Sequence, residues 1–243
     1  MKIVYFDCFS GIAGDMTLGA LLDLGIPFDL FKKELNNLFL SGFQIEIKRV
    51  TRNHISAQDV YINVTDTQPH RSFADIQSII ENSNLSNKIK EQSLNIFKKL
   101  AKAEGNIHHV PYKKIHFHEV GAVDSIIDIV GSIILLNYYK IEKIYASPLP
   151  LGKGFVDCAH GKLPIPAPAT LELVKNIPVY QTKRQQELVT PTGAAIITTI
   201  AETFGEMPQM KINRIGYGAG KTQSTFPNLL RIYLGKLDFT KRN

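Results

Sequence analysis

Hydrophobic and polar positions repeat with two different periods in the first half of the chain. The run KIVYFD at residues 2–7 is β-rich and ends in a Cys-Phe-Ser-Gly turn, which predicts a buried first strand. Residues 43–51 and 55–65 alternate with a period of two, and the three residues between them predict a β-hairpin. Helical spacing predicts helices at 14–25, 27–39, 72–82 and 86–104.

The second half alternates helices with short strands. An apolar run from Val120 onward predicts a helix, and the Gly- and Pro-rich stretch 149–170 predicts an irregular loop or a hairpin. Thr190 is suited to cap a helix that starts at Pro191 and stops at Gly205. The remaining predicted elements are a strand at 143–147, a short helix at 170–176, and closing strands at 210–218 and 228–235.

The order of these elements predicts a mixed-sheet α/β protein in which helices pack on the sheet, rather than a plain Rossmann fold. No internal repeat, low-complexity tract or clear linker divides the chain. We therefore expect one region over residues 1–243, with a small sub-domain near residues 40–70.

Composition narrows the class of protein. The formal charge is +6, and the lysines and arginines come singly or in pairs, so nucleic acid is disfavoured as a partner while a small anionic substrate fits. The two cysteines, Cys8 and Cys158, are far apart, which excludes a disulfide framework and a multi-thiolate zinc site. With no signal peptide and no long apolar window, we expect a cytoplasmic protein without a membrane partner.

The first strand-to-helix junction, DCFSGIAGDM, is a candidate anion site. Small residues before a helix leave backbone N–H groups free to hold a phosphate, and we assign this role to Ser10, Gly11, Gly14 and Asp15. The alternative is a tight turn in which Asp15 simply interacts with the helix dipole.

Two further motifs contain glycine, and only the second of them is a candidate phosphate site. GYGAGKT at 216–222 is no P-loop, because Ile215 stands where that motif requires glycine and a strand follows instead of a helix. In LVTPTGAA, capping explains Thr190. Thr192 and Gly193 lie inside the helix, and we interpret them as a second phosphate seat.

The stretch IHFHEVGAVDSIIDIV, at 115–130, is a candidate metal site. In a strand His116 and His118 share one side, and in a helix Asp124 and Asp128 share one face. Imidazole suits nickel, copper or zinc, whereas carboxylates alone suit magnesium or manganese. The alternative is that Glu119 and Asp124 cap a helix beside half-buried histidines. A second nitrogen and sulfur pair, Cys158 with His160, lies in the later loop.

Six motifs, in order, carry a family resemblance. FDCFSGIAGDMTLGALLDLG, HFHEVGAVDSIIDIVG, YASPLPLG, CAHGKLPIPAPATLELV, ELVTPTGAA and IGYGAG closely resemble the LarC family of nickel-insertion proteins over essentially the whole chain. The resemblance implies CTP-dependent insertion of nickel into pyridinium-3,5-bisthiocarboxylic acid mononucleotide, which completes the cofactor of lactate racemase. Members typically continue into a C-terminal domain associated with CTP, together with a divalent metal, and with oligomerisation. This chain resembles the N-terminal part, so a C-terminal partner part is expected and CTP is assigned to no residue here.

These observations together predict a nickel site and a substrate site. The expected nickel ligands are His116, His118, Glu119, Asp124, Asp128 and His160, with the two aspartates as ligands or as acceptors that orient the imidazoles. Insertion at a ring carbon expels a proton, and His118 and Glu119 are the candidate bases. Two other functions stay open: a non-catalytic nickel store or metallochaperone, and a divalent-metal phosphohydrolase that uses Asp7, Asp15 and the 116–128 cluster.

Overall fold

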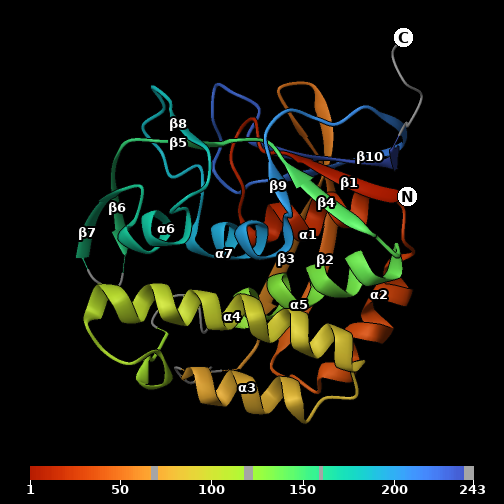
Figure 1. The fold of residues 1–243 in the computed structure, drawn as a ribbon. Coiled ribbons are helices and arrows are strands. Elements are labelled where there is room, and N and C mark those ends of the chain that lie inside the picture. The colour runs from red at the N-terminus through yellow and green to blue at the C-terminus, as the bar shows by residue number, and fades with distance from the viewer. Residues whose placement is uncertain (67–70, 118–122, 159–160, 238–243) are drawn as a thin grey trace.

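A seven-stranded mixed sheet is the framework of the computed structural model, which describes residues 1–66, 71–117, 123–158 and 161–237 (Figure 1). The strand order is β2-β3-β10-β11-β1-β4-β9. The strands of this sheet are β1 (Lys2–Asp7), β2 (Phe43–Arg52), β3 (Ile55–Val64), β4 (Lys143–Ala146), β9 (Thr203–Phe204), β10 (Met210–Ala219) and β11 (Leu229–Leu237).

Strand direction brings several strand ends to one edge of the sheet. β1 runs parallel to β4 and antiparallel to β11, and β11 runs antiparallel to β10. The carboxyl ends of β1, β4 and β10 therefore meet the start of β11 at the same edge. In open α/β sheets this is the edge outside which ligands bind.

The helices gather on one side of this sheet in Figure 1, and α1 packs against β10 and β3 while α5 packs against α1. Farther from the sheet, α4 contacts α5, α6 and α7, and α3 lies against α4. The helices are α1 (Gly14–Asp23), α2 (Phe28–Leu35), α3 (Phe73–Glu81), α4 (Asn87–His108), α5 (Val123–Tyr138), α6 (Pro168–Leu173) and α7 (Pro191–Ile200), with short 3₁₀ turns η1 (Asn36–Leu38) and η2 (Tyr112–Lys114).

Alternation along β1 explains how the sheet separates its two faces. Val4 and Phe6 are fully buried in the main hydrophobic core, which also includes residues of α1 and α5. Tyr5 points the other way, where its ring stacks on Tyr233 of β11 at a centroid distance of 6.3 Å. The helix-covered face of β1 is thus apolar, and the opposite face carries tyrosines.

Local chemistry confirms several predicted boundaries. The hairpin joins β2 to β3 through Asn53 and His54, both with positive φ (48° and 65°), as a two-residue turn of the primed kind requires. Ser72 and Asp75 form a reciprocal capping box at the start of α3. The hairpin, for which a small sub-domain is predicted, joins the large sheet where β3 runs beside β10.

Other boundaries differ from the prediction. Helix α7 ends at Ile200 rather than at Gly205, because residues 203–204 form β9 and pair with β4 as an added edge strand. The Gly- and Pro-rich stretch forms strand pairs, which confirms the hairpin rather than the irregular loop. These are β5 (Leu149–Leu151), which pairs in parallel with β8 (Val179–Gln181), and the antiparallel hairpin of β6 (Gly154–Cys158) and β7 (Gly161–Ile165).

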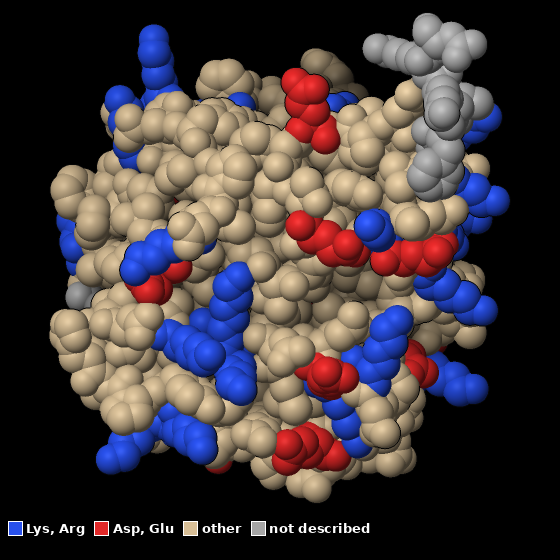
Figure 2. Space-filling view, in the orientation of Figure 1, with Lys and Arg blue, Asp and Glu red and all other residues tan. Residues whose placement is uncertain are grey.

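The described part of the chain has no helix that is both long and apolar enough to cross a membrane. On the face that Figure 2 shows, acidic and basic side chains are interspersed and form no continuous basic stripe. The phosphate backbone of a nucleic acid is bound by such a stripe, so this face has no sign of that partner.

Candidate functional site: carboxylates at two helix starts

Helices α1 and α5 begin next to each other at the edge where β1 ends. Gly14, the first residue of α1, lies so close to Asp128 of α5 that a Cβ added to it would stand 2.3 Å from Asp128 Oδ2. Asp15 and Asp124, in the first turns of the two helices, act electrostatically on Asp128. The close approach permitted by Gly14 thus assembles three carboxylates, which we call the carboxylate cluster.

Asp128 is the most unusual member of the carboxylate cluster. Its exposed fraction is 8%, and its Oδ1 has no hydrogen-bond partner among the described residues. Burial, and after it the charges of Asp15 and Asp124, raise the pKa of Asp128 well above its ordinary range. A buried carboxylate that lacks donors is destabilising as an anion, so this position favours either a proton or a cation.

Asp15 shares this environment but has a basic neighbour. Burial raises its pKa from 3.8 to about 6, against the opposing effect of Lys221. The Lys221 Nζ lies 3.8 Å from Asp15 Oδ2. Asp15 also accepts a hydrogen bond from the backbone N–H of Met16 (2.8 Å), so it stays closer to ionisation than Asp128 does.

Lys221 is anchored mainly by Asp59 of β3, a residue that sequence reasoning missed. Asp59 is fully buried and is paired with the Lys221 ammonium, with Arg52 Nη2 at 3.3 Å and with the Tyr61 hydroxyl at 3.0 Å. The Lys221 Nζ also lies 4.0 Å from the centroid of the Tyr61 ring. Asp59 is therefore a satisfied structural carboxylate, in contrast to Asp128.

The predicted metal ligands are only partly brought together. Asp124 and Asp128 share one face of α5, as the helical spacing predicts, with Asp124 exposed and Asp128 buried. His116 is exposed and bridges to Ser72 beside the start of α3, where its charge acts on Asp75. It is not among the charges that act on Asp15 or Asp128.

Three of the predicted ligands, His118, Glu119 and His160, lie outside the described residues, as does the side chain of Cys158. Within the part of the chain that the structure describes, no group of three or more His, Cys, Asp or Glu side chains is arranged to hold a metal ion. The carboxylate cluster alone is thus not a complete metal site.

The two predicted phosphate seats come together as one structure. Gly11, with φ of +108°, lies against Leu188, and Ile12 N–H donates to the Leu188 carbonyl at 2.8 Å. Gly193 packs on the backbone of Ile12, and its own N–H is bound by the Thr190 hydroxyl at 3.1 Å. Close backbone packing therefore accounts for both glycines, while Thr192 stays half-buried at the start of α7.

The packed segments 10–14 and 188–193 are called the double loop below. Ser10 connects the double loop to Arg184, a cation that the sequence analysis did not identify. The Ser10 side chain, in a residue only 1% exposed, accepts a hydrogen bond of 2.6 Å from Arg184 Nη1. The Arg184 guanidinium lies 4.4 Å from the centroid of the Phe226 ring. Nearby, Asp7 at the end of β1 accepts from Nε and Nη2 of Arg231, at 3.0 and 2.6 Å.

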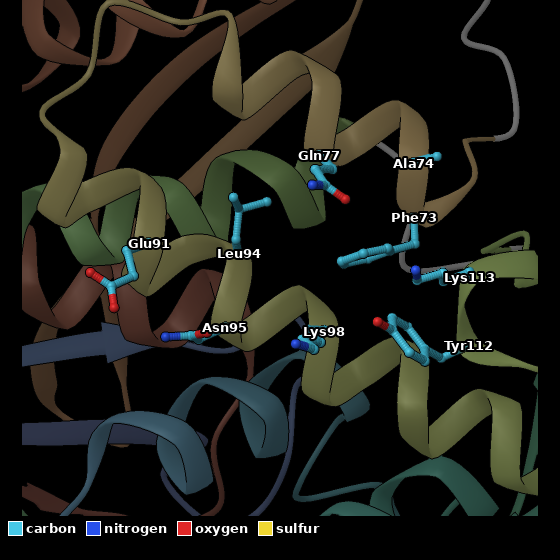
Figure 3. Close-up of a pocket in the computed structure, with 9 residues that line it drawn as sticks. All are labelled: Phe73, Ala74, Gln77, Glu91, Leu94, Asn95, Lys98, Tyr112 and Lys113. Carbon is cyan, nitrogen blue, oxygen red and sulfur yellow. The ribbon is translucent and has the colours of Figure 1, made fainter.

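A surface cavity of about 630 Å³ lies elsewhere, between α3, α4 and η2 (Figure 3). The rings of Phe73 and Tyr112 meet edge to face in it, at a centroid distance of 5.7 Å. Lys98 and Lys113 also line it, with Glu91 at the opposite end in the view. None of its lining residues belongs to the carboxylate cluster or to the double loop, so we assign it no role.

Comparison with known proteins identifies the family. A putative nickel insertion protein of Dictyoglomus thermophilum is 54% identical over 98% of this chain and 61% of the relative. The pyridinium-3,5-bisthiocarboxylic acid mononucleotide nickel insertion protein of Desulfitobacterium hafniense is 48% identical over 98% of this chain and 59% of the relative. The chain thus spans about 60% of the length of these curated relatives.

No solved structure matches the chain. The sequence model of the family described as nickel insertion protein matches residues 4–243. With nearly the whole chain matched and relatives about half identical to it, the chain belongs to the nickel insertion protein family.

Proposed function

We propose that this chain is the nickel-binding part of an enzyme that inserts nickel into pyridinium-3,5-bisthiocarboxylic acid mononucleotide. Family membership and the name of the Desulfitobacterium relative support this assignment of the substrate. The reaction is that of a nickel chelatase and cyclometallase of the lyase class. It depends on CTP bound with a divalent metal by a C-terminal part, and the product serves lactate racemase in the cytoplasm.

The observation that carries this proposal is the unpartnered carboxylate of Asp128. Its Oδ1 is buried without a hydrogen-bond donor among the described residues, beside Asp15 and Asp124. Three neighbouring carboxylates repel one another, and a divalent cation relieves both the repulsion and the missing donors. A purely structural aspartate would be satisfied as Asp59 is.

The bound metal is nickel rather than magnesium because of the ligands that are expected beside the carboxylate cluster. The segment that directly precedes α5 in the sequence contains His118 and Glu119, and imidazole favours nickel over the hard oxygen-seeking cations. We propose Asp128, Asp124 and Glu119 as carboxylate ligands and His118 as an imidazole ligand. His116 and His160 are the further imidazole candidates.

Insertion at the ring carbon also requires a proton acceptor. The ring C–H bond breaks, its electron pair forms the bond to Ni²⁺, and the proton leaves to a base within hydrogen-bond reach. Candidates are Glu119 and His118. The two sulfurs of the substrate complete the attachment of nickel, so the protein must release its own ligands as the product forms.

The test is reconstitution from separately purified parts. The chain, the C-terminal part of a relative, Ni²⁺, CTP and the mononucleotide are incubated, and nickel in the mononucleotide is measured by mass spectrometry. We expect Asp128→Asn to lower product formation about a hundredfold, because it removes the buried charge that nickel compensates. Asp29→Asn, which alters an exposed first-turn aspartate of α2, is the matched control and should retain wild-type rates.

Equal rates for Asp128→Asn and wild type would remove Asp128 from the nickel site. Nickel bound by the chain, with none transferred to the mononucleotide under any condition, would instead leave a nickel store or metallochaperone as the function. Nickel-independent release of phosphate from a generic ester would favour the phosphohydrolase.

A further inference from the structure

Arg184 stands over the double loop with its main chain held on both sides. Its backbone N–H donates to the Thr182 hydroxyl at 3.2 Å, and its carbonyl accepts from the Lys153 N–H at 2.9 Å. The side chain then reaches Ser10, 174 residues earlier in the sequence, with a hydrogen bond of 2.6 Å. An arginine anchored at both ends in this way is preorganised, so its side chain loses less conformational entropy when it binds a ligand.

The charge of Arg184 has no acidic partner among the residues that the structure describes. No carboxylate among the described residues forms an ion pair with Arg184, whereas Arg231 is paired with Asp7 through two hydrogen bonds. Ser10 accepts from only one of the guanidinium nitrogens, Nη1. Since a guanidinium has five N–H donors in a fork that matches carboxylate and phosphate oxygens, Arg184 retains donors for an anion.

An exposed aromatic ring packs on this guanidinium, and a second aromatic side chain lies within its electrostatic reach. Phe226, on the loop between β10 and β11, is 50% exposed with its ring centroid 4.4 Å from the Arg184 Cζ. Tyr180 of β8 is 46% exposed and lies within electrostatic reach of Arg184. A cation packed on an exposed ring is typical of a site for a ligand that carries both an anionic group and a planar ring.

We propose that Arg184, Ser10 and Phe226 form the seat for the phosphate monoester of an aromatic mononucleotide. Arg184 binds the phosphate, Ser10 positions the guanidinium, and the ring of Phe226 packs on the planar part of the ligand. This inference rests on the proposed function, and it moves the phosphate contact from the backbone of the first loop to a side chain above it. The double loop then acts as the support that holds Arg184 in place.

The seat lies near the carboxylate cluster along the chain. Ser10 comes four residues before Gly14, against which Asp128 packs, and both belong to the junction between β1 and α1. A mononucleotide whose phosphate is held at one end of this short junction can present its ring toward the other end. Nickel and substrate would then approach each other over the same edge of the sheet.

Calorimetric binding of two probes to the intact chain tests the seat. The probes are the pyridinium bisthiocarboxylate mononucleotide and phenyl phosphate, each compared with the matching compound that lacks the phosphate. We expect Arg184→Gln to weaken both phosphate-bearing probes about tenfold to a hundredfold, the usual loss for a charge-assisted hydrogen bond, and to leave the phosphate-free compounds unchanged. Arg184→Lys should restore part of the loss.

The matched control is Lys183→Gln, which removes the same charge from the adjacent, exposed residue. It should change affinity less than about twofold, because the charge of an exposed lysine is screened by water and salt. Equal affinity of wild type and Arg184→Gln for the phosphate-bearing probes would overturn the seat. Equal losses in Lys183→Gln would also overturn it, and so would a wild type that binds neither of the two probes. If phenyl phosphate binds through Arg184 and the mononucleotide does not bind, the seat stands and the proposed substrate falls.

Discussion

Asp128 and Asp59 show how two buried aspartates of one chain can have opposite roles. Asp59 is surrounded by Arg52, Tyr61 and Lys221, which satisfy it as an anion. Asp128 has a buried oxygen to which no group in the described part of the chain donates, and it lies beside two other carboxylates. Ionised Asp128 therefore destabilises the fold unless a proton or cation compensates it, and this has a measurable dependence on pH.

We expect Asp128→Asn to stabilise the chain at pH 8 by about 5 °C in Tm and to have little effect near pH 4. The pKa of Asp128 is raised in the folded state, so between its unfolded value near 3.9 and its folded value the native chain binds more protons than the unfolded one. Stability consequently falls as pH rises through that window, and asparagine has no such proton to lose.

Asp15 adds to the same trend, since its folded pKa of about 6 means that stability is lost between about pH 4 and pH 6. Asp124, Asp59 and Lys221 are the other charges that act on the pair. Thermal melting in metal-free buffer from pH 4 to pH 8 measures the effect; a Tm difference independent of pH would show that Asp128 is not ionised by unfolding.

At the scale of the element, glycine sets how closely α1 lies on the sheet. A Cβ on Gly218 of β10 would stand 1.8 Å from the Met16 carbonyl oxygen of α1, and one on Gly216 would stand 2.1 Å from the Ala20 carbonyl oxygen. The motif GYGAGKT, which resembles a P-loop superficially, thus owes these two glycines to the contact between helix and sheet. This contact also brings Lys221 beside Asp15.

Gly218→Ala should lower the free energy of unfolding by at least about 2 kcal/mol, because neither backbone can move aside without disturbing the sheet. Gly131→Ala in α5 is the contrasting variant. Its Cβ would meet Leu18 Cδ1 at 3.0 Å and the Phe31 ring at 3.1 Å, side-chain atoms that can shift, and alanine favours the helix. We expect a net change below about 1 kcal/mol, measured by denaturant unfolding. Similar losses in both variants would contradict the backbone origin of the effect.

Elements were predictable where their signals are local. The turn at Asn53 and His54, the cap at Ser72 and the start of α7 at Pro191 all depend on residues within one turn of chain. The end of α7 was not predictable, since residues 203–204 leave the helix to pair with β4, almost 60 residues earlier. That pairing adds sheet hydrogen bonds that helical periodicity cannot reveal.

At the scale of the whole molecule, the chain matches 59–61% of the length of two relatives. We expect this chain alone to bind nickel and the mononucleotide but to form no product. Adding the C-terminal part of a relative, to which the resemblance assigns CTP, should restore turnover. The measurement is nickel in the mononucleotide with and without that part. Turnover by this chain alone would show that the N-terminal region carries every catalytic group.

The sequence by itself determined the class of fold, the order of the main elements, the shared face of Asp124 and Asp128, and the family. Each of these depends on spacing along the chain or on continuous motifs. Only the tertiary structure decided that Gly14 brings Asp128 to Asp15, that Asp59 anchors Lys221, and that Arg184 reaches Ser10. These partners are separated by more than a hundred residues, and their meeting depends on strand order and on close helix–sheet packing, which no local pattern contains.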